Sequence, residues 1–152
     1  MTATLDVNIL LYAANSSSER HERARRLLEH VAAGPAILHL FWPVLIGYVR
    51  IATHPAVFER PLGLEEALAG IDDLLDRPHV RASGEEDPFW PTFRRVAADV
   101  GSRGNLVSDA HLVALMGQHG VSTIWSHDRD FRKFTGITPK DPFDDRYTNG
   151  FS

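Results

Sequence analysis

The chain has 152 residues, of which 43% are hydrophobic and 24% charged, which is typical of one globular domain. It contains no cysteine, and this excludes thiol catalysis, disulfides and cysteine-ligated zinc. No stretch approaches the roughly 20 apolar residues of a membrane-spanning helix. The N-terminus has no basic segment of the kind that opens a signal peptide, so we expect a cytoplasmic protein. The formal net charge of −4 does not by itself indicate a nucleic-acid-binding protein.

Short apolar segments alternate with longer amphipathic ones along the chain. The strand candidates are residues 2–5, 36–41, 79–82 and 121–125. The helix candidates are residues 7–14, 19–33, 43–53 and 64–75, a segment after Pro88, and residues 109–119. Residues 140–152 are polar and are expected to form a loop or tail. The alternation predicts one α/β domain over residues 1–152, with a parallel sheet and helices on both of its faces.

Aspartates follow the strand candidates at the positions where such sheets bind ligands. Asp6 comes directly after residues 2–5, Asp128 and Asp130 follow residues 121–125, and Asp109 opens a helix candidate. The carboxyl ends of parallel strands share one edge, and ligands bind outside that edge. We therefore expect three or four carboxylates to converge on one concave site.

Converging carboxylates need either protons or a cation. Two like charges about 4 Å apart repel by roughly 4 kcal/mol at an effective dielectric constant near 20. Ligands that are all oxygen suit Mg²⁺ or Mn²⁺ better than zinc. Magnesium held by a few carboxylates activates water and neutralises charge on a phosphate, which is the chemistry of phosphodiester hydrolysis.

Structural interpretations of the same residues stay open. Asp6 and Asp128 would also serve as caps, and Asp109 would complement its helix dipole. His111 and His127 are interpreted as ordinary polar groups. The sequence also contains two basic clusters, a helical one interpreted as a solvated face and a later one placed to steer phosphate. The clusters are Arg20, Arg23, Arg25 and Arg26, and Arg129, Arg132 and Lys133.

Four segments together resemble the PIN-domain ribonucleases. Residues 5–13 (LDVNILLYA) resemble the opening D-x-N-x-L motif, and residues 108–114 (SDAHLVA) resemble the central DA-x-x-x-A motif. Residues 124–131 (IWSHDRDF) resemble the late T/S-x-D-x-D-F motif, and residues 47–58 (GYVRIATHPAVF) resemble the middle helix and loop of the VapC toxin branch. Order and spacing agree from about Ala3 to Gly136.

The resemblance implies a PIN fold and an endoribonuclease that depends on Mg²⁺ or Mn²⁺, the toxin of a type II toxin–antitoxin module. By motif match, Asp6, Asp109 and Asp128 would be the catalytic, metal-binding carboxylates. Asn8 and Ser126 would support them, and Asp130 would be a peripheral acid. The resemblance further implies an RNA substrate, a cognate antitoxin as partner and a homodimer, with no membrane association.

Gly47 departs from the family pattern. The family usually carries a glutamate three residues before the arginine that is Arg50 here. One explanation is that the missing acid is an outer ligand of the metal whose place water takes. Another is that Asp130 compensates for it. Otherwise the protein is a catalytically weak module that binds RNA or an antitoxin. A DNA nuclease or phosphatase on the same carboxylates is a third alternative.

Four aromatic side chains bear on partner binding, namely Trp42, Phe58, Phe89 and Trp90. We interpret them as core residues. The alternative is an exposed apolar groove for an antitoxin helix.

Overall fold

A computed structural model describes residues 2–148 of the chain. Within that range the strands form one five-stranded sheet in the order β3-β2-β1-β4-β5, and all neighbouring pairs are parallel. The strands are β1 (Ala3–Leu5), β2 (Leu38–Phe41), β3 (Val80–Ser83), β4 (Thr123–Trp125) and β5 (Thr138–Lys140). The predicted α/β class with a parallel sheet is therefore confirmed.

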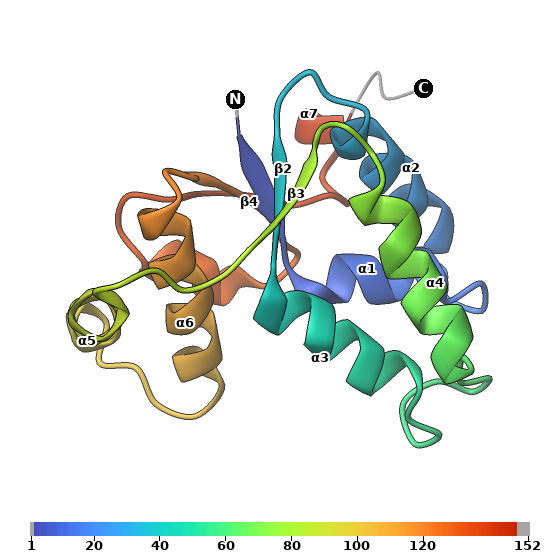
Figure 1. The fold of residues 1–152 in the computed structure, drawn as a ribbon, viewed down its shortest axis with the longest axis horizontal. Helices are drawn as coiled ribbons and strands as arrows, with labels where there is room; N and C mark the ends of the chain where they lie inside the picture. The colour runs from blue at the N-terminus through green and yellow to red at the C-terminus, as the bar shows by residue number, and fades with distance from the viewer. Residues whose placement is uncertain (1, 149–152) are drawn as a thin grey trace.

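Helices cover the sheet from both sides, as predicted. They are α1 (Val7–Ala14), α2 (His21–Ala32), α3 (Trp42–Ala52), α4 (Leu64–Leu75), α5 (Phe89–Asp99), α6 (Asn105–Gln118), the 3-10 helix η1 (Arg129–Lys133) and α7 (Asp145–Thr148). Helices α1 to α4 lie together on one side of the strands, and α5 and α6 lie on the other (Figure 1). No described helix has both the length and the apolar character needed to cross a membrane.

The core explains why these segments fold as they do. Leu5, Leu40 and Ile124 are fully buried in three adjacent strands, which fits strands covered on both faces. In α6 the buried residues run from Leu112 to Met116 without a break, so this helix packs within the molecule rather than on its surface. Gly120 follows with a φ of 66°, the left-handed conformation that ends many helices, which confirms the predicted stop.

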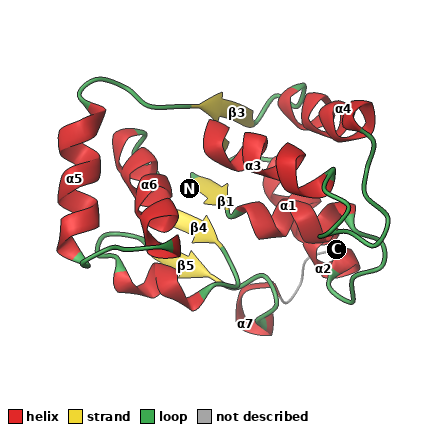
Figure 2. Ribbon diagram, turned by 90° about the horizontal axis from the view of Figure 1, so that it is seen from below, coloured by secondary structure: helices red, strands yellow, loops and turns green. Residues whose placement is uncertain are grey.

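The order of the strands places the site. From β1 the chain builds outward through β2 to β3 on one side, and β4 and β5 are added on the other side of β1. The carboxyl ends of β1 and β4 are therefore neighbours at the point where the strand order reverses, which is where open α/β sheets bind ligands. Figure 2 shows β1, β4 and β5 side by side and pointing the same way.

Several boundaries differ from the sequence prediction. Helix α6 begins at Asn105 rather than Asp109, because it starts directly after Gly104 and Leu106 packs against the core. Strand β5 was not predicted, since Pro139 argues against a strand, but β5 is an edge strand, where proline is tolerated. The predicted tail at 140–152 was wrong for its first part, which completes β5 and forms α7, and residues 149–152 lie outside the described range.

The aromatic residues do not all belong to the core. Phe58 is buried and Phe89 is half-buried against the core, as expected. Trp42 and Trp90 are 46% and 66% exposed, and this corrects the core interpretation for both. Trp42 opens α3 and Trp90 lies on α5.

Candidate metal centre

Ser126 joins the loops that leave β1 and β4. Its hydroxyl donates a hydrogen bond to Asp6 Oδ2 at 2.9 Å and accepts one from the backbone N–H of Asp128 at 3.0 Å. The backbone N–H of Asp6 donates to the carbonyl of Trp125 at 3.0 Å, and that of Ser126 donates to the carbonyl of Lys140 at 2.9 Å. Adjacent strands thus fix the positions of Asp6 and Asp128 through a side chain that is 3% exposed.

Asp109, Asp128 and Asp130 bring three carboxylates together. One oxygen from each lies within 4.8 Å of the others. Asp109 comes from the second turn of α6 and Asp128 directly precedes η1, while Asp130 lies in the first turn of η1. The backbone N–H of Asp130 donates to Asp128 Oδ1 at 2.9 Å, so the turn itself orients the Asp128 carboxylate.

Electrostatics at the site favour a bound proton or cation. Burial, followed by the negative charges of Asp128, Asp6 and Asp130, raises the pKa of Asp109 to about 7. Burial also raises the pKa of Asp6, although the hydrogen bond from Ser126 opposes that shift. Asp6 occupies the N-cap position of α1, but its side chain makes no capping hydrogen bond within the described residues. The backbone N–H groups of Val7 and Asn8 nevertheless lower the pKa of Asp6, so a capping role and a place at the acidic site both fit this residue.

The donor set fits a hard divalent cation. The atoms that converge are carboxylate oxygens, and the group that orients Asp6 by a hydrogen bond is the hydroxyl of Ser126. Such oxygen ligands suit Mg²⁺ or Mn²⁺. Burial and the repulsion of neighbouring carboxylates raise the pKa of Asp109, and a bound cation would offset both effects. The motif match makes Asp130 a peripheral acid, whereas the structure places it in the same cluster as Asp109 and Asp128.

Asn8 and Gly47 lie beside the start of α1. Asn8 is exposed in the first turn of α1, two residues after Asp6. A Cβ atom added to Gly47 would lie 3.8 Å from Val7 Cγ2, an ordinary contact distance, so a side chain fits there without displacing its neighbour. Because Val7 directly follows Asp6, position 47 is close in space to the loop that carries that carboxylate.

The later basic cluster borders the carboxylates. Arg129, Arg132 and Lys133 are exposed on η1. Lys133 Nζ lies 3.1 Å from Asp130 Oδ1, so this lysine balances a site carboxylate. In the first cluster, two arginines contact the C-terminal segment rather than the acidic cluster. Arg23 pairs with Asp145 at 2.7 Å, and the guanidinium of Arg20 lies 4.9 Å from the Phe143 ring centroid.

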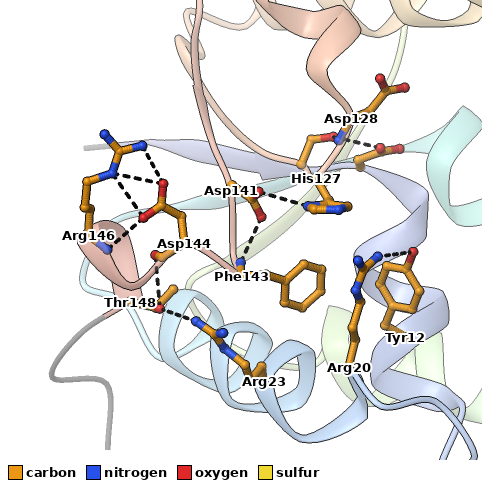
Figure 3. Close-up of polar contacts among 12 residues, drawn as sticks. Tyr12, Arg20, Arg23, His127, Asp128, Asp141, Phe143, Asp144, Arg146 and Thr148 are labelled. Carbon is orange, nitrogen blue, oxygen red and sulfur yellow. Dashed lines mark hydrogen bonds and ion pairs between the residues drawn. The ribbon is translucent and has the colours of Figure 1, made fainter.

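The sequence pattern did not predict the contacts that the C-terminal segment makes beside the site. His127 Nδ1 lies 2.9 Å from Asp141 Oδ2, and the His127 ring contacts Phe143 edge to face. Figure 3 shows Asp141 and Phe143 beside His127, just below Asp128. Phe143 and Tyr147 were the available signals, since they are aromatic residues in a mostly polar stretch. His111 pairs with Glu85 at 2.6 Å, in keeping with its interpretation as an ordinary polar group.

Comparison with known proteins gives the class first. The PIN domain family matches residues 3–137, which covers β1 through η1, and the fold is that of a PIN domain. The acidic cluster is consistent with the metal site of PIN nucleases. Ribonuclease VapC48 of Mycobacterium tuberculosis is 53% identical over 143 residues, covering 94% of this chain and 99% of the relative. Ribonuclease VapC37 of the same organism is 36% identical, covering 88% and 92%. The chain belongs to the VapC family of PIN-domain ribonucleases, the toxins of toxin–antitoxin systems.

Solved structures share the fold at low sequence identity. The Mycobacterium tuberculosis toxin VapC20, described as cleaving the Sarcin-Ricin loop, has a TM-score of 0.64 and 19% identity, covering 90% of this chain and 99% of that one. VapBC-1 from nontypeable Haemophilus influenzae has a TM-score of 0.67 and 16% identity, covering 95% and 100%.

Proposed function

We propose that this VapC ribonuclease hydrolyses RNA phosphodiesters with a divalent cation, Mg²⁺ or Mn²⁺. Asp6, Asp109 and Asp128 would hold the cation, and Asp130 lies close enough to share it. The observation that carries the proposal is the convergence of carboxylate oxygens of Asp109, Asp128 and Asp130 within 4.8 Å at the carboxyl edge of the sheet. Asp6 is included because Ser126 holds its carboxylate beside this cluster and because its charge helps to raise the pKa of Asp109. When bound, the cation lowers the pKa of a coordinated water and neutralises charge on the phosphate.

The chain's own groups have distinct tasks in this proposal. Ser126 orients the Asp6 carboxylate and, through the backbone of Asp128, fixes the distance between the two loops. Lys133 keeps Asp130 in place by ion pairing. Arg129 and Arg132, exposed beside the carboxylates, attract the phosphates of the substrate, since basic groups supply the non-specific part of RNA affinity.

Cleavage of total cellular RNA by the purified protein tests the proposal. It is assayed with Mg²⁺, with Mn²⁺ and with chelator. Asp6→Asn should lower the rate by about 100-fold or more, because changes to groups that merely support metal ligands already cost 10- to 100-fold. Asp72→Asn is the matched control, an exposed aspartate on α4 that should cleave normally. Cleavage that persists in chelator or in Asp6→Asn would reject the assignment.

Gly47 is the observation that favours a second candidate, a module that binds RNA or an antitoxin with weak catalysis. The chain lacks an acid at this position, although there is space for a side chain. The four aspartates at the site argue for retained activity. A folded protein that binds RNA but yields no metal-dependent products would favour the binding module.

We also propose an antitoxin partner and a homodimer. Solved structures that share the fold include VapBC2 from Rickettsia felis, bound to a DNA fragment from its promoter. On this chain, apolar side chains are exposed along α3 and α4, namely Trp42, Ile46, Leu64 and Leu68. Exposed apolar side chains, where they gather on one face, are typical of protein interfaces. Light scattering of the protein, alone and co-expressed with the antitoxin encoded beside it, measures both associations.

A further inference from the structure

A cavity of about 160 Å³ lies between η1 and the C-terminal segment, next to the acidic cluster. One wall carries Arg129, Arg132 and Asp128, the opposite wall carries Asp141 and Tyr147, and Ser126 also contributes to the lining. Because Asp128 belongs to both the cavity and the acidic cluster, whatever occupies the cavity is adjacent to the proposed reaction centre.

The wall formed by the C-terminal segment is held in place by specific contacts. Asp141 accepts a hydrogen bond from the backbone N–H of Phe143 at 2.9 Å and lies 2.9 Å from His127 Nδ1. The Phe143 ring packs against the guanidinium of Arg20 and, edge to face, against Tyr12 at 5.6 Å between centroids (Figure 3). These contacts join the segment to α1 and to the loop after β4.

Helix α7 positions Tyr147 at the mouth of the cavity. Arg23 on α2 holds this short helix by contacts with Asp145 at 2.7 Å and Thr148 at 3.2 Å. The backbone N–H of Tyr147 donates to the carbonyl of Asp144 at 3.0 Å, while the ring remains 38% exposed. Asp141 and Tyr147 both lie beyond residues 3–137, the range that matches the PIN domain family.

The chemistry of the lining suits one nucleotide. Two arginines present cationic donors for a phosphate. The guanidinium of Arg146 lies over the Tyr147 ring, 5.6 Å from its centroid, and the face of the ring turned away from Arg146 is the one offered to a base. The carboxylates of the C-terminal segment have cationic partners of their own, because Asp141 pairs with His127 and Asp144 with Arg146. The charge of Arg132 also contributes to the lowered pKa of Asp144, but more weakly than Arg146. A volume of about 160 Å³ is well below the roughly 300 Å³ at which pockets for drug-sized ligands begin, so the cavity takes the phosphate end of the nucleotide while the base lies at the mouth, against Tyr147.

We propose that this cavity is a subsite for one nucleotide of single-stranded RNA, immediately beside the cleaved phosphodiester. Arg129 and Arg132 bind its phosphate and Tyr147 stacks on its base. The inference rests on the proposed ribonuclease function. Tyr147 is a positioning residue that acts through substrate binding, not through the chemical step.

RNA affinity measured in chelator tests the subsite without cleavage. The probe is a fluorescein-labelled single-stranded RNA octamer, followed by fluorescence anisotropy. Tyr147→Ala should weaken binding roughly five- to a hundredfold, the range for loss of one base–aromatic stack, whereas Tyr147→Phe should keep it. Trp90→Ala is the matched control, an exposed aromatic residue on α5, far from α7 in Figures 1 and 2. Tyr147→Ala binding as tightly as the parent, or no more weakly than Trp90→Ala, would overturn the proposal.

Salt dependence provides a second measurement. Arg132→Ala should reduce the slope of log affinity against log salt concentration by about 0.7, the contribution of one phosphate contact to a single strand. An unchanged slope would remove Arg132 from the subsite and overturn the phosphate assignment. Failure of the proposed function is recognised separately, because it shows as cleavage that is insensitive to Asp6→Asn or to chelator.

Discussion

Ser126 illustrates how one small side chain organises the site. It is buried, donates to the carboxylate after β1 and accepts from the backbone of the loop after β4. Removing its hydroxyl leaves the backbone N–H of Asp128 without its acceptor and releases the Asp6 carboxylate. A buried polar group that loses its partner costs about 1–3 kcal/mol.

We therefore expect Ser126→Ala to reduce both stability and activity. The free energy of unfolding should fall by about 1–3 kcal/mol, and metal-dependent cleavage should fall 10- to 100-fold, as for other groups that orient metal ligands. Urea denaturation and RNA cleavage measure the two effects. Ser122→Ala, at an exposed serine just before β4, is the control. Full activity in Ser126→Ala would show that Asp6 needs no orienting donor.

The raised pKa of Asp109 predicts that the stability of the metal-free protein depends on pH. Its pKa is raised from 3.8 to about 7, so the folded protein keeps a proton that the unfolded chain loses. Stability must then fall as the pH rises from about 4 towards 7. Asp109→Asn removes the charge, and its melting temperature in chelator should exceed that of the parent by about 2 °C or more at pH 8. The difference should vanish towards pH 4. A parent that melts higher at pH 8 would contradict the raised pKa.

At the scale of elements, α3 meets the start of α1 at Gly47. The space beside Val7 accepts a side chain, so Gly47→Glu should fold, and loss of a helical glycine should itself stabilise the helix by up to about 1 kcal/mol. Asp130 already lies in the acidic cluster, and we therefore expect cleavage to change by less than about tenfold. Gly47→Ala provides the control for helix propensity without the carboxylate. A much larger rise in metal-dependent cleavage would show that the native site is impaired.

Two other elements show where sequence patterns were insufficient to predict secondary structure. Starting α6 at Asn105 puts Asp109 in the second turn, where the helix dipole no longer explains an acid, since its effect is confined to the first turn. Strand β5 contains Pro139 and reads as a loop, yet the carbonyl of Lys140 accepts the hydrogen bond that holds Ser126. Neither feature has a local signal strong enough to predict it.

At the scale of the whole molecule, a cation that binds only the folded protein must stabilise it. The metal ligands come from separate parts of the chain, so the unfolded state has no comparable site. At a free cation concentration of 100 Kd the gain is about 2.7 kcal/mol. Thermal unfolding with increasing Mn²⁺ should show the melting temperature rising in the parent and not in Asp128→Asn. An equal rise in both would place the binding elsewhere.

The sequence by itself determined the class of fold and the positions of the acids along the chain. Apolar periodicity is local, and the rules for parallel sheets turn an order of elements into a shared carboxyl edge. The match of four motifs then indicated the family that the comparisons confirm.

Only the tertiary structure decided how the acids group and what borders them. It placed Asp130 with Asp109 and Asp128, connected Asp6 to them through Ser126, and built a cavity wall from a segment that the sequence predicted to be a tail. Some of these contacts join residues more than a hundred positions apart, as Asp6 and Ser126 do, and as Arg23 and Asp145 do. Their formation depends on packing between elements, which no local pattern of residues specifies.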